Sequence, residues 1–160
     1  MSEVKLYFED LNPGRVFHGG PVTLEADELV DFARQYDPQP FHLTEAGGCA
    51  SIFGGLVASG WQTAALTMRM FVHSDLKRVA NGLIGLQIDK LTFHQPVRPG
   101  DTLQSEFDVL NRKRSHSKPG FGVVHTCWRT YNQHGDMVMS LECAIWVATR
   151  PSGAADEVSV

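Results

Sequence analysis

The spacing of apolar residues predicts two helices in the first half of the chain. From Thr23, the expected N-cap, to Tyr36 the apolar residues recur at a 3.6-residue spacing, and Pro38 stops the helix. Over residues 60–73 the apolar side chains fill most of the helical circumference. A helix this apolar is buried on more than one side, so we expect another element to wrap around it.

The second half of the chain has the two-residue alternation of β-strands. Four such segments follow the turn at Asn81-Gly82, and they cover residues 83–95, 102–112, 121–131 and 137–148. An earlier strand over residues 16–24 contains Gly19-Gly20-Pro21, so we expect it to be bent or to lie at a sheet edge. Long antiparallel strands after one buried helix predict an α+β fold in which a single curled sheet wraps around that helix.

The composition indicates one domain and excludes several classes of function. The chain has 160 residues, of which we assign 1–150 to a single domain and 151–160, which lack a core-forming pattern, to a disordered tail. A net charge of −4 argues against nucleic-acid binding, because no basic field would attract phosphates. The chain shows neither an apolar leader nor a run long enough to span a bilayer. Its three cysteines have no disulfide or zinc spacing, so we expect a cytoplasmic protein.

The candidate chemistry lies between the two predicted helices. Asp37 and His42 are five positions apart on a segment that contains two prolines, which should hold the carboxylate and the imidazole on a rigid, non-helical arm. Ser59-Gly60 lies where the second helix begins, and a helix N-terminus offers unpaired N–H groups to a developing oxyanion. By residue type alone, an Asp before Pro is usually a turn residue, a lone His is usually structural and a helix-start Gly usually serves packing. Together these groups have an enzyme-like arrangement.

Three motifs, taken together, identify a family. They are Phe32-Ala33 leading to Asp37-Pro38-Gln39-Pro40-Phe41-His42, the glycine Gly60 that opens the central helix, and Phe93-His94-Gln95-Pro96-Val97-Arg98-Pro99-Gly100-Asp101. With these motifs, nearly the whole chain resembles the MaoC-type (R)-specific enoyl-CoA hydratases and dehydratases, which have the hot-dog fold. The family often has Asn two residues after the aspartate and His before the glycine. This chain has Gln39 and Ser59 there, and both neighbours help to shape the site.

The resemblance implies the roles of several residues. Asp37 and His42 would act as the acid–base pair on one water, and the Gly60 N–H would hold the thioester oxygen. Further residues expected to contact the substrate are Gln39, Phe41, Ser59 and Trp61, together with Arg112 and Lys113 of a basic cluster that could attract the phosphates of coenzyme A. The resemblance implies no cofactor beyond the thioester itself. No two histidines have metal-ligand spacing, so we predict no metal.

Partners and competing functions follow from the same resemblance. The substrate would be an acyl-CoA or acyl carrier thioester, and the protein a homodimer or higher homo-oligomer, because an open sheet edge needs a cover. The first hypothesis is a lyase that hydrates trans-2-enoyl-CoA or dehydrates (R)-3-hydroxyacyl-CoA. A hot-dog thioesterase usually has its carboxylate on the central helix, and residues 60–73 contain no Asp or Glu. A non-catalytic acyl-CoA binding or accessory subunit is the third hypothesis, suggested by Gln39 and Ser59.

Overall fold

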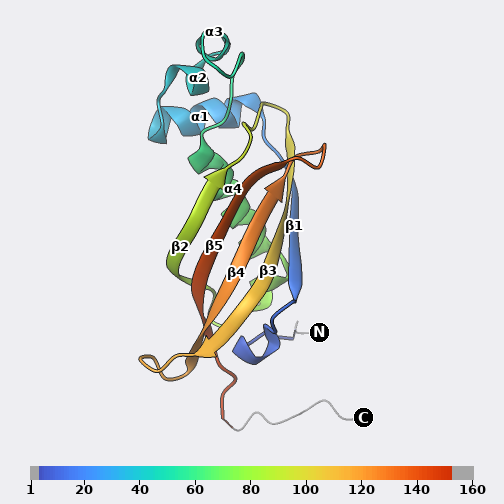
Figure 1. Ribbon diagram of the computed structural model, residues 1–160, viewed down its shortest axis with the longest axis vertical. Coiled ribbons are helices and arrows are strands. Elements are labelled where there is room, and N and C mark those ends of the chain that lie inside the picture. The colour runs from blue at the N-terminus through green and yellow to red at the C-terminus, as the bar shows by residue number, and fades with distance from the viewer. Residues whose placement is uncertain (1–3, 153–160) are drawn as a thin grey trace.

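The predicted hot-dog fold is confirmed by a computed structural model, which describes residues 4–152. A curled antiparallel sheet of five strands wraps around one long helix, α4 (Gly60–His73) (Figure 1). The strand order is β1-β3-β4-β5-β2. The bounds are β1 (Val16–Thr23), β2 (Ile84–Phe93), β3 (Thr102–Arg114), β4 (Phe121–Tyr131) and β5 (Met137–Ala148). Residues 153–160 of the predicted tail lie outside the described residues.

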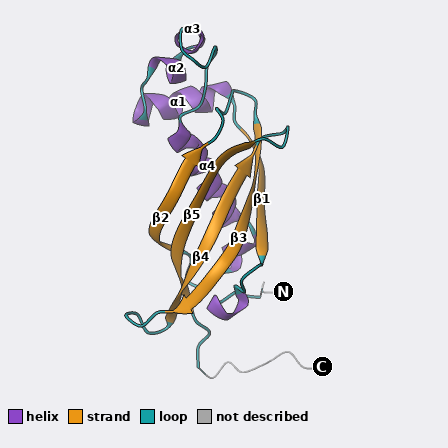
Figure 2. Ribbon diagram, viewed as in Figure 1, coloured by secondary structure: helices purple, strands orange, loops and turns teal. Residues whose placement is uncertain are grey.

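The remaining helices gather at the two ends of the sheet. Three lie together at the end where α4 begins: α1 (Ala26–Tyr36), α2 (Pro40–Leu43) and α3 (Glu45–Cys49) (Figure 2). The 3-10 turn η1 (Phe8–Asp10) lies at the opposite end, and a second one, η2 (Asp75–Arg78), follows α4 directly. The two ends of the molecule are therefore separated by the length of the sheet.

The core lies between α4 and the inner face of the sheet. The ring of Phe71 on α4 stacks on Trp128 of β4 with centroids 4.2 Å apart, and it meets Phe107 of β3 edge to face at 5.0 Å. Aromatic pairs of this kind add stabilisation beyond the area that they bury. The edge position predicted for β1 is confirmed, and its register shifts between Gly19 and Val22.

The burial of α4 differs from the expectation. Its buried residues include three polar ones, while the apolar Trp61, Met68 and Val72 are exposed in the single chain. The buried polar groups find partners, as Thr67 does by donating to the Thr63 carbonyl at 2.9 Å and meeting the Thr130 hydroxyl at 2.7 Å. Part of the apolar surface of α4 is therefore not buried by the sheet of a single chain.

The start of the first helix was predicted two residues too early. Thr23 is the last residue of β1, where its hydroxyl meets that of Thr102 at 2.8 Å, and the N-cap of α1 is Glu25. Pairing with β3 outweighs the capping preference of threonine, because the side chain finds a hydroxyl partner across the strands. At the other end, Tyr36 is exposed rather than part of the buried face of α1.

Candidate active site

Asp37 and His42 converge beside the start of α4. Asp37 follows the last residue of α1, and its N–H donates to the Ala33 carbonyl at 2.9 Å. The predicted non-helical arm is wrong for His42, which lies on α2, because Pro40 takes the first position of that helix and needs no N–H partner there. His42 Nε2 lies 3.3 Å from Asp37 Oδ2, and both side chains are largely buried.

The orientation of His42 is set by a carbonyl group. Its Nδ1 lies 2.7 Å from the Val57 oxygen, in the chain segment that leads into α4. A carbonyl oxygen can only accept a hydrogen bond, so Nδ1 carries the proton. In the neutral imidazole, Nε2 then presents a lone pair toward the Asp37 carboxylate. Sequence reasoning missed Val57, because a backbone acceptor leaves no signal in residue type.

Both oxygens of Asp37 accept hydrogen bonds from neutral side chains. Ser59 Oγ donates to Oδ2 at 2.7 Å, and Gln39 Nε2 donates to Oδ1 at 2.7 Å. Partial burial by itself raises the pKa of the Asp37 carboxyl, but the hydrogen bonds from Ser59 and Gln39 and the nearby His42 outweigh it. The pKa of Asp37 therefore lies below its ordinary value of 3.8, and the group is ionised at neutral pH.

The prediction that the central helix begins at Gly60 is confirmed. Ser59 is its N-cap, is fully buried, and accepts the Trp61 N–H on Oγ at 3.3 Å. Among the described residues 4–152, no acceptor lies against the Gly60 N–H, as expected for the first turn of a helix. A Cβ on Gly60 would come within 2.7 Å of the Phe93 ring, so a side chain at this position would require the ring or the helix start to shift.

The aromatic residues predicted to contact the substrate lie around this helix start. Phe41 packs edge to face on His42, with centroids 4.5 Å apart, and on Phe53 at 5.3 Å. Trp61 is 61% exposed and meets Phe93 edge to face at 6.3 Å. The structure thus brings these two predicted residues, with Gln39 and Ser59, to the same place as Asp37.

Two charged residues that sequence reasoning did not assign hold the segment above the site. Glu45 accepts the Leu56 N–H at 3.2 Å, and Arg98 donates to the Phe53 carbonyl at 2.7 Å. Arg98 belongs to the Phe93–Asp101 motif, but the motif did not indicate that Arg98 binds the Phe53 carbonyl. These bonds fix the chain between α3 and α4, which carries the Val57 carbonyl.

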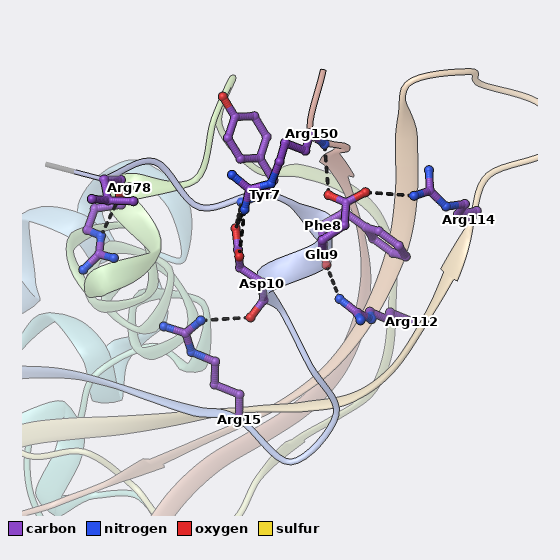
Figure 3. A network of polar contacts seen from close by, with 10 residues as sticks. Tyr7, Phe8, Glu9, Asp10, Arg15, Arg78, Arg112, Arg114 and Arg150 are labelled. Atoms are coloured by element: carbon purple, nitrogen blue, oxygen red, sulfur yellow. Dashed lines mark hydrogen bonds and ion pairs between the residues drawn. The ribbon is translucent and has the colours of Figure 1, made fainter. Parts of the chain in front are cut away.

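Arg112 and Lys113 lie elsewhere. They are on β3 at the opposite end of the sheet, about ten residues and roughly 33 Å along the strand from Thr102. Arg112 donates to the Phe8 carbonyl at 2.6 Å and covers the Phe8 ring, in a network that joins η1 to β3 and to Arg150, which follows β5 (Figure 3). Within one chain, the structure does not bring these two residues to Asp37.

In residues 4–152, no group of three or more His, Cys, Asp or Glu side chains is arranged to hold a metal ion. None of the described helices has the length and apolar character needed to cross a membrane. The three cysteines, Cys49, Cys127 and Cys143, are free thiols.

The fold and the site together define a class of protein, a hot-dog domain with a carboxylate–imidazole pair at the start of its central helix. Sequence comparison is more specific. The chain belongs to the MaoC-like domain family, whose sequence model matches residues 10–128. The matched part contains Asp37, His42 and Gly60.

Known proteins similar to this chain cover most of its length. The MaoC-like dehydratase from Rhodospirillum rubrum is 42% identical with a TM-score of 0.85, over 91% of this chain and 99% of that chain. The uncharacterized protein YdeM of Bacillus subtilis is 26% identical over 140 residues, which are 87% of this chain and 96% of that protein. The R-hydratase PhaJ1 from Pseudomonas aeruginosa has a TM-score of 0.72 at 24% identity, over 98% of this chain and 97% of that chain, a likeness of fold alone.

Proposed function

We propose that the protein is a hydro-lyase that adds water to a trans-2-enoyl thioester, or removes it from an (R)-3-hydroxyacyl thioester. The observation that carries the proposal is the contact of His42 Nε2 with Asp37 Oδ2, 3.3 Å apart, at the start of α4. Family membership and the 42% identical dehydratase support the reaction class.

The hydrogen-bond pattern supports a single water between the two groups. Because the Val57 carbonyl accepts a hydrogen bond from Nδ1–H, Nε2 of the neutral ring and the carboxylate are both acceptors, and one water can donate a hydrogen bond to each. Its oxygen lone pairs are then free to attack the β-carbon of the enoyl group. One of the two groups accepts the proton released by the attacking water and then delivers a proton to the α-carbon, so that the hydroxyl and the proton of one water are added across the double bond.

The start of α4 supplies the third requirement of the reaction. Negative charge develops on the thioester oxygen as the enolate forms, and an N–H donor must hold it. The Gly60 N–H has no acceptor among the described residues and lies at the positive end of the α4 dipole. Ser59 caps α4 and also donates to Asp37, so one residue connects the helix start that carries the Gly60 N–H to the carboxylate.

The exposed apolar surface supports a homodimer and an acyl site at its interface. An apolar cavity of about 420 Å³ opens between α4 and β2 and is lined by Met68, Val72, Leu86 and Ile88, among others. The edge strand β2 is exposed along nearly its whole length. A second copy that covers this edge would close the cavity into a tunnel for an acyl chain. Arg112 and Lys113 remain candidates for phosphate contacts only in such an assembly. The free thiols suit the cytoplasm, which we propose as the location.

One assay tests the proposal. The protein is mixed with crotonyl-CoA and with a longer enoyl-CoA, the conjugated absorbance is followed, and free thiol is trapped. Loss of absorbance without thiol release is the expected result. Thiol release would instead identify a thioesterase, and binding without either change would identify an accessory subunit.

Replacing Asp37 tests the role of the carboxylate. Asp37→Ala should lower kcat by about 10²- to 10⁴-fold, because a general base is lost. The fold should survive, since Asp37 lies at a helix end rather than in the core, and this is checked by circular dichroism. Asp27→Asn, a change of an exposed acid in the first turn of α1, is the matched control. A variant Asp37→Ala that keeps most of the hydratase rate would refute the assignment.

A further inference from the structure

The carbonyl that holds His42 belongs to a peptide group with a second partner. His42 Nδ1 donates to the Val57 oxygen at 2.7 Å. The N–H of the same peptide group, that of Ala58, donates to the Val97 carbonyl at 2.8 Å. A peptide group that donates through its N–H becomes a better acceptor through its C=O, because each bond polarises the other. The Val97 carbonyl therefore strengthens the hold of the Val57 carbonyl on the His42 proton.

This chain of hydrogen bonds continues to a carboxylate. The Val97 carbonyl shares its peptide group with the Arg98 N–H, which donates to Asp101 Oδ2 at 2.8 Å. A hydrogen bond to an ionised group is roughly twice as strong as one between neutral groups. Two peptide groups thus connect the imidazole of His42 to Asp101, which has no part in the reaction steps described above.

The middle of the chain of hydrogen bonds lies in the protein interior. The residues that contribute its peptide groups, Val57, Ala58 and Val97, are 1%, 6% and 2% exposed. Hydrogen bonds are electrostatically stronger in such surroundings than in water, and they polarise one another more. Asp101, at the far end, is partly buried. The effect of its charge is therefore transmitted through a region from which water is excluded.

Two carboxylates compete for the single ring proton of neutral His42. Asp37 Oδ2 lies 3.3 Å from Nε2 and favours a proton on that nitrogen. Asp101 favours a proton on Nδ1, because it polarises the peptide groups that end at the Val57 carbonyl, 2.7 Å from Nδ1. A proton on Nε2 would leave no lone pair there to accept a hydrogen bond from the water. The outcome of this competition decides whether His42 can act as a base toward that water.

We propose that Asp101 is a positioning residue that keeps the proton of neutral His42 on Nδ1, acting through the two peptide groups. The proposal rests on the acid–base role of His42 inferred above, and Asp101 itself does not touch the substrate. Its action requires the negative charge as well as the accepting oxygen, since a neutral acceptor polarises the peptide groups less.

Nitrogen-15 NMR of histidine-labelled protein tests the proposal without substrate. At a pH at which the ring is neutral, the chemical shifts of the two His42 nitrogens give the ratio of its tautomers. Asp101→Asn keeps an oxygen that can accept the Arg98 N–H but removes the charge, so the ratio of Nδ1–H to Nε2–H should fall about 3-fold. Asp136→Asn, which neutralises an exposed acid directly before β5, is the matched control and should keep the wild-type ratio.

The integrity of the chain of hydrogen bonds is checked in the same samples. The coupling across the bond from the Ala58 N–H to the Val97 carbonyl should persist in Asp101→Asn, which shows that the charge and not the backbone geometry has changed. If that variant does not fold or loses the coupling, Asp101→Ser replaces it, because a serine hydroxyl can also accept a nearby backbone N–H. An unchanged tautomer ratio, or an equal change in Asp136→Asn, would overturn the proposal.

Kinetics keep this result separate from the function proposed above. With crotonyl-CoA, kcat of the wild type and of Asp101→Asn should follow the fraction of His42 that carries its proton on Nδ1, while KM stays the same. A wild type that hydrates no enoyl thioester would refute the proposed hydro-lyase. The tautomer ratios would still decide the role of Asp101, because they are measured on the free protein.

Discussion

At the scale of single residues, the Asp37 carboxylate accepts a hydrogen bond on each of its two oxygens. Ser59 and Gln39 each bind one of its oxygens, and His42 lies next to the oxygen that Ser59 binds. Hydrogen bonds to the charged form favour that form, which is why the pKa of Asp37 falls although partial burial opposes it. A carboxylate with a lowered pKa stays ionised to lower pH, so the acid limb of the pH profile should lie below the ordinary carboxyl range.

Ser59 provides a test of this electrostatic account. Ser59→Ala removes the donor to Oδ2, so the pKa of Asp37 should rise toward 3.8 and the acid limb of kcat/KM should move to higher pH. The same change removes the N-cap of α4, which should cost about 1 kcal/mol of stability. The measurements are a pH–rate profile and denaturant unfolding.

A second serine separates the two effects of that change. Ser74 is also a buried N-cap, at η2, and has no contact with Asp37. Ser74→Ala should therefore lose stability as Ser59→Ala does, but keep the acid limb of the wild type. An identical shift of the limb in both variants would contradict a direct effect of Ser59 on the carboxylate.

At the scale of elements, the position of α4 depends on how closely β2 approaches its first residue. The Phe93 ring, at the end of β2, covers Gly60 so tightly that a Cβ would lie 2.7 Å from it. The start of α4 and the end of β2 therefore pack closely against each other at this glycine. The Gly60 N–H, the oxyanion donor that we propose, therefore depends on this packing for its position.

A methyl group on Gly60 should disturb this packing. Gly60→Ala keeps the backbone N–H but displaces the helix start or the ring, so kcat should fall at least about 10-fold, since small misplacements of reacting groups are costly. Adding Phe93→Leu, which shortens the obstructing side chain, should recover part of the rate. Steady-state kinetics of the single and double variants measure this. An unaffected Gly60→Ala rate would mean that the helix start tolerates a shift.

At the scale of the whole molecule, the two edge strands of the sheet differ in the apolar surface that they expose. The register shifts in both edge strands, but β2 exposes the apolar Ile84, Leu86 and Ile88, whereas on β1 the exposed large apolar residue is Val16. An exposed apolar edge strand is prone to pair with another chain. Together with the exposed face of α4, β2 provides the surface on which we expect the second copy.

A charge on β2 should separate the two copies. Ile88→Lys, at a position that is 61% exposed in the single chain, should shift the protein from dimer to monomer in sedimentation velocity at micromolar concentration. Its hydratase activity should fall with the dimer, because the acyl cavity loses one wall. Val16→Lys, at an exposed apolar position on the opposite edge strand β1, should remain dimeric. A wild-type protein that sediments as a monomer would refute this picture.

The elements themselves could be predicted because local patterns determine them. The periodicity located α4 and the long strands, and the glycine after Ser59 marked the helix start within a residue. The motif around Asp37 identified the acid and the imidazole. The start of α1 was predicted wrongly, because Thr23 pairs with Thr102, a residue distant in sequence. The conformation around His42 was also predicted wrongly, because proline can either end a helix or occupy its first position, and Pro40 does the latter.

The sequence by itself therefore determined the fold class and the family, and it predicted candidates for the acid, the base and the oxyanion donor, because periodicity and residue type are local properties. Only the tertiary structure decided which nitrogen of His42 faces Asp37, that Ser59 binds the carboxylate, and that Arg112 lies at the far end of the sheet. It also left the apolar face of α4 open and the oxygen of Gln62 unpaired. These features arise from contacts between segments far apart in the chain, whose distances and directions no local pattern encodes.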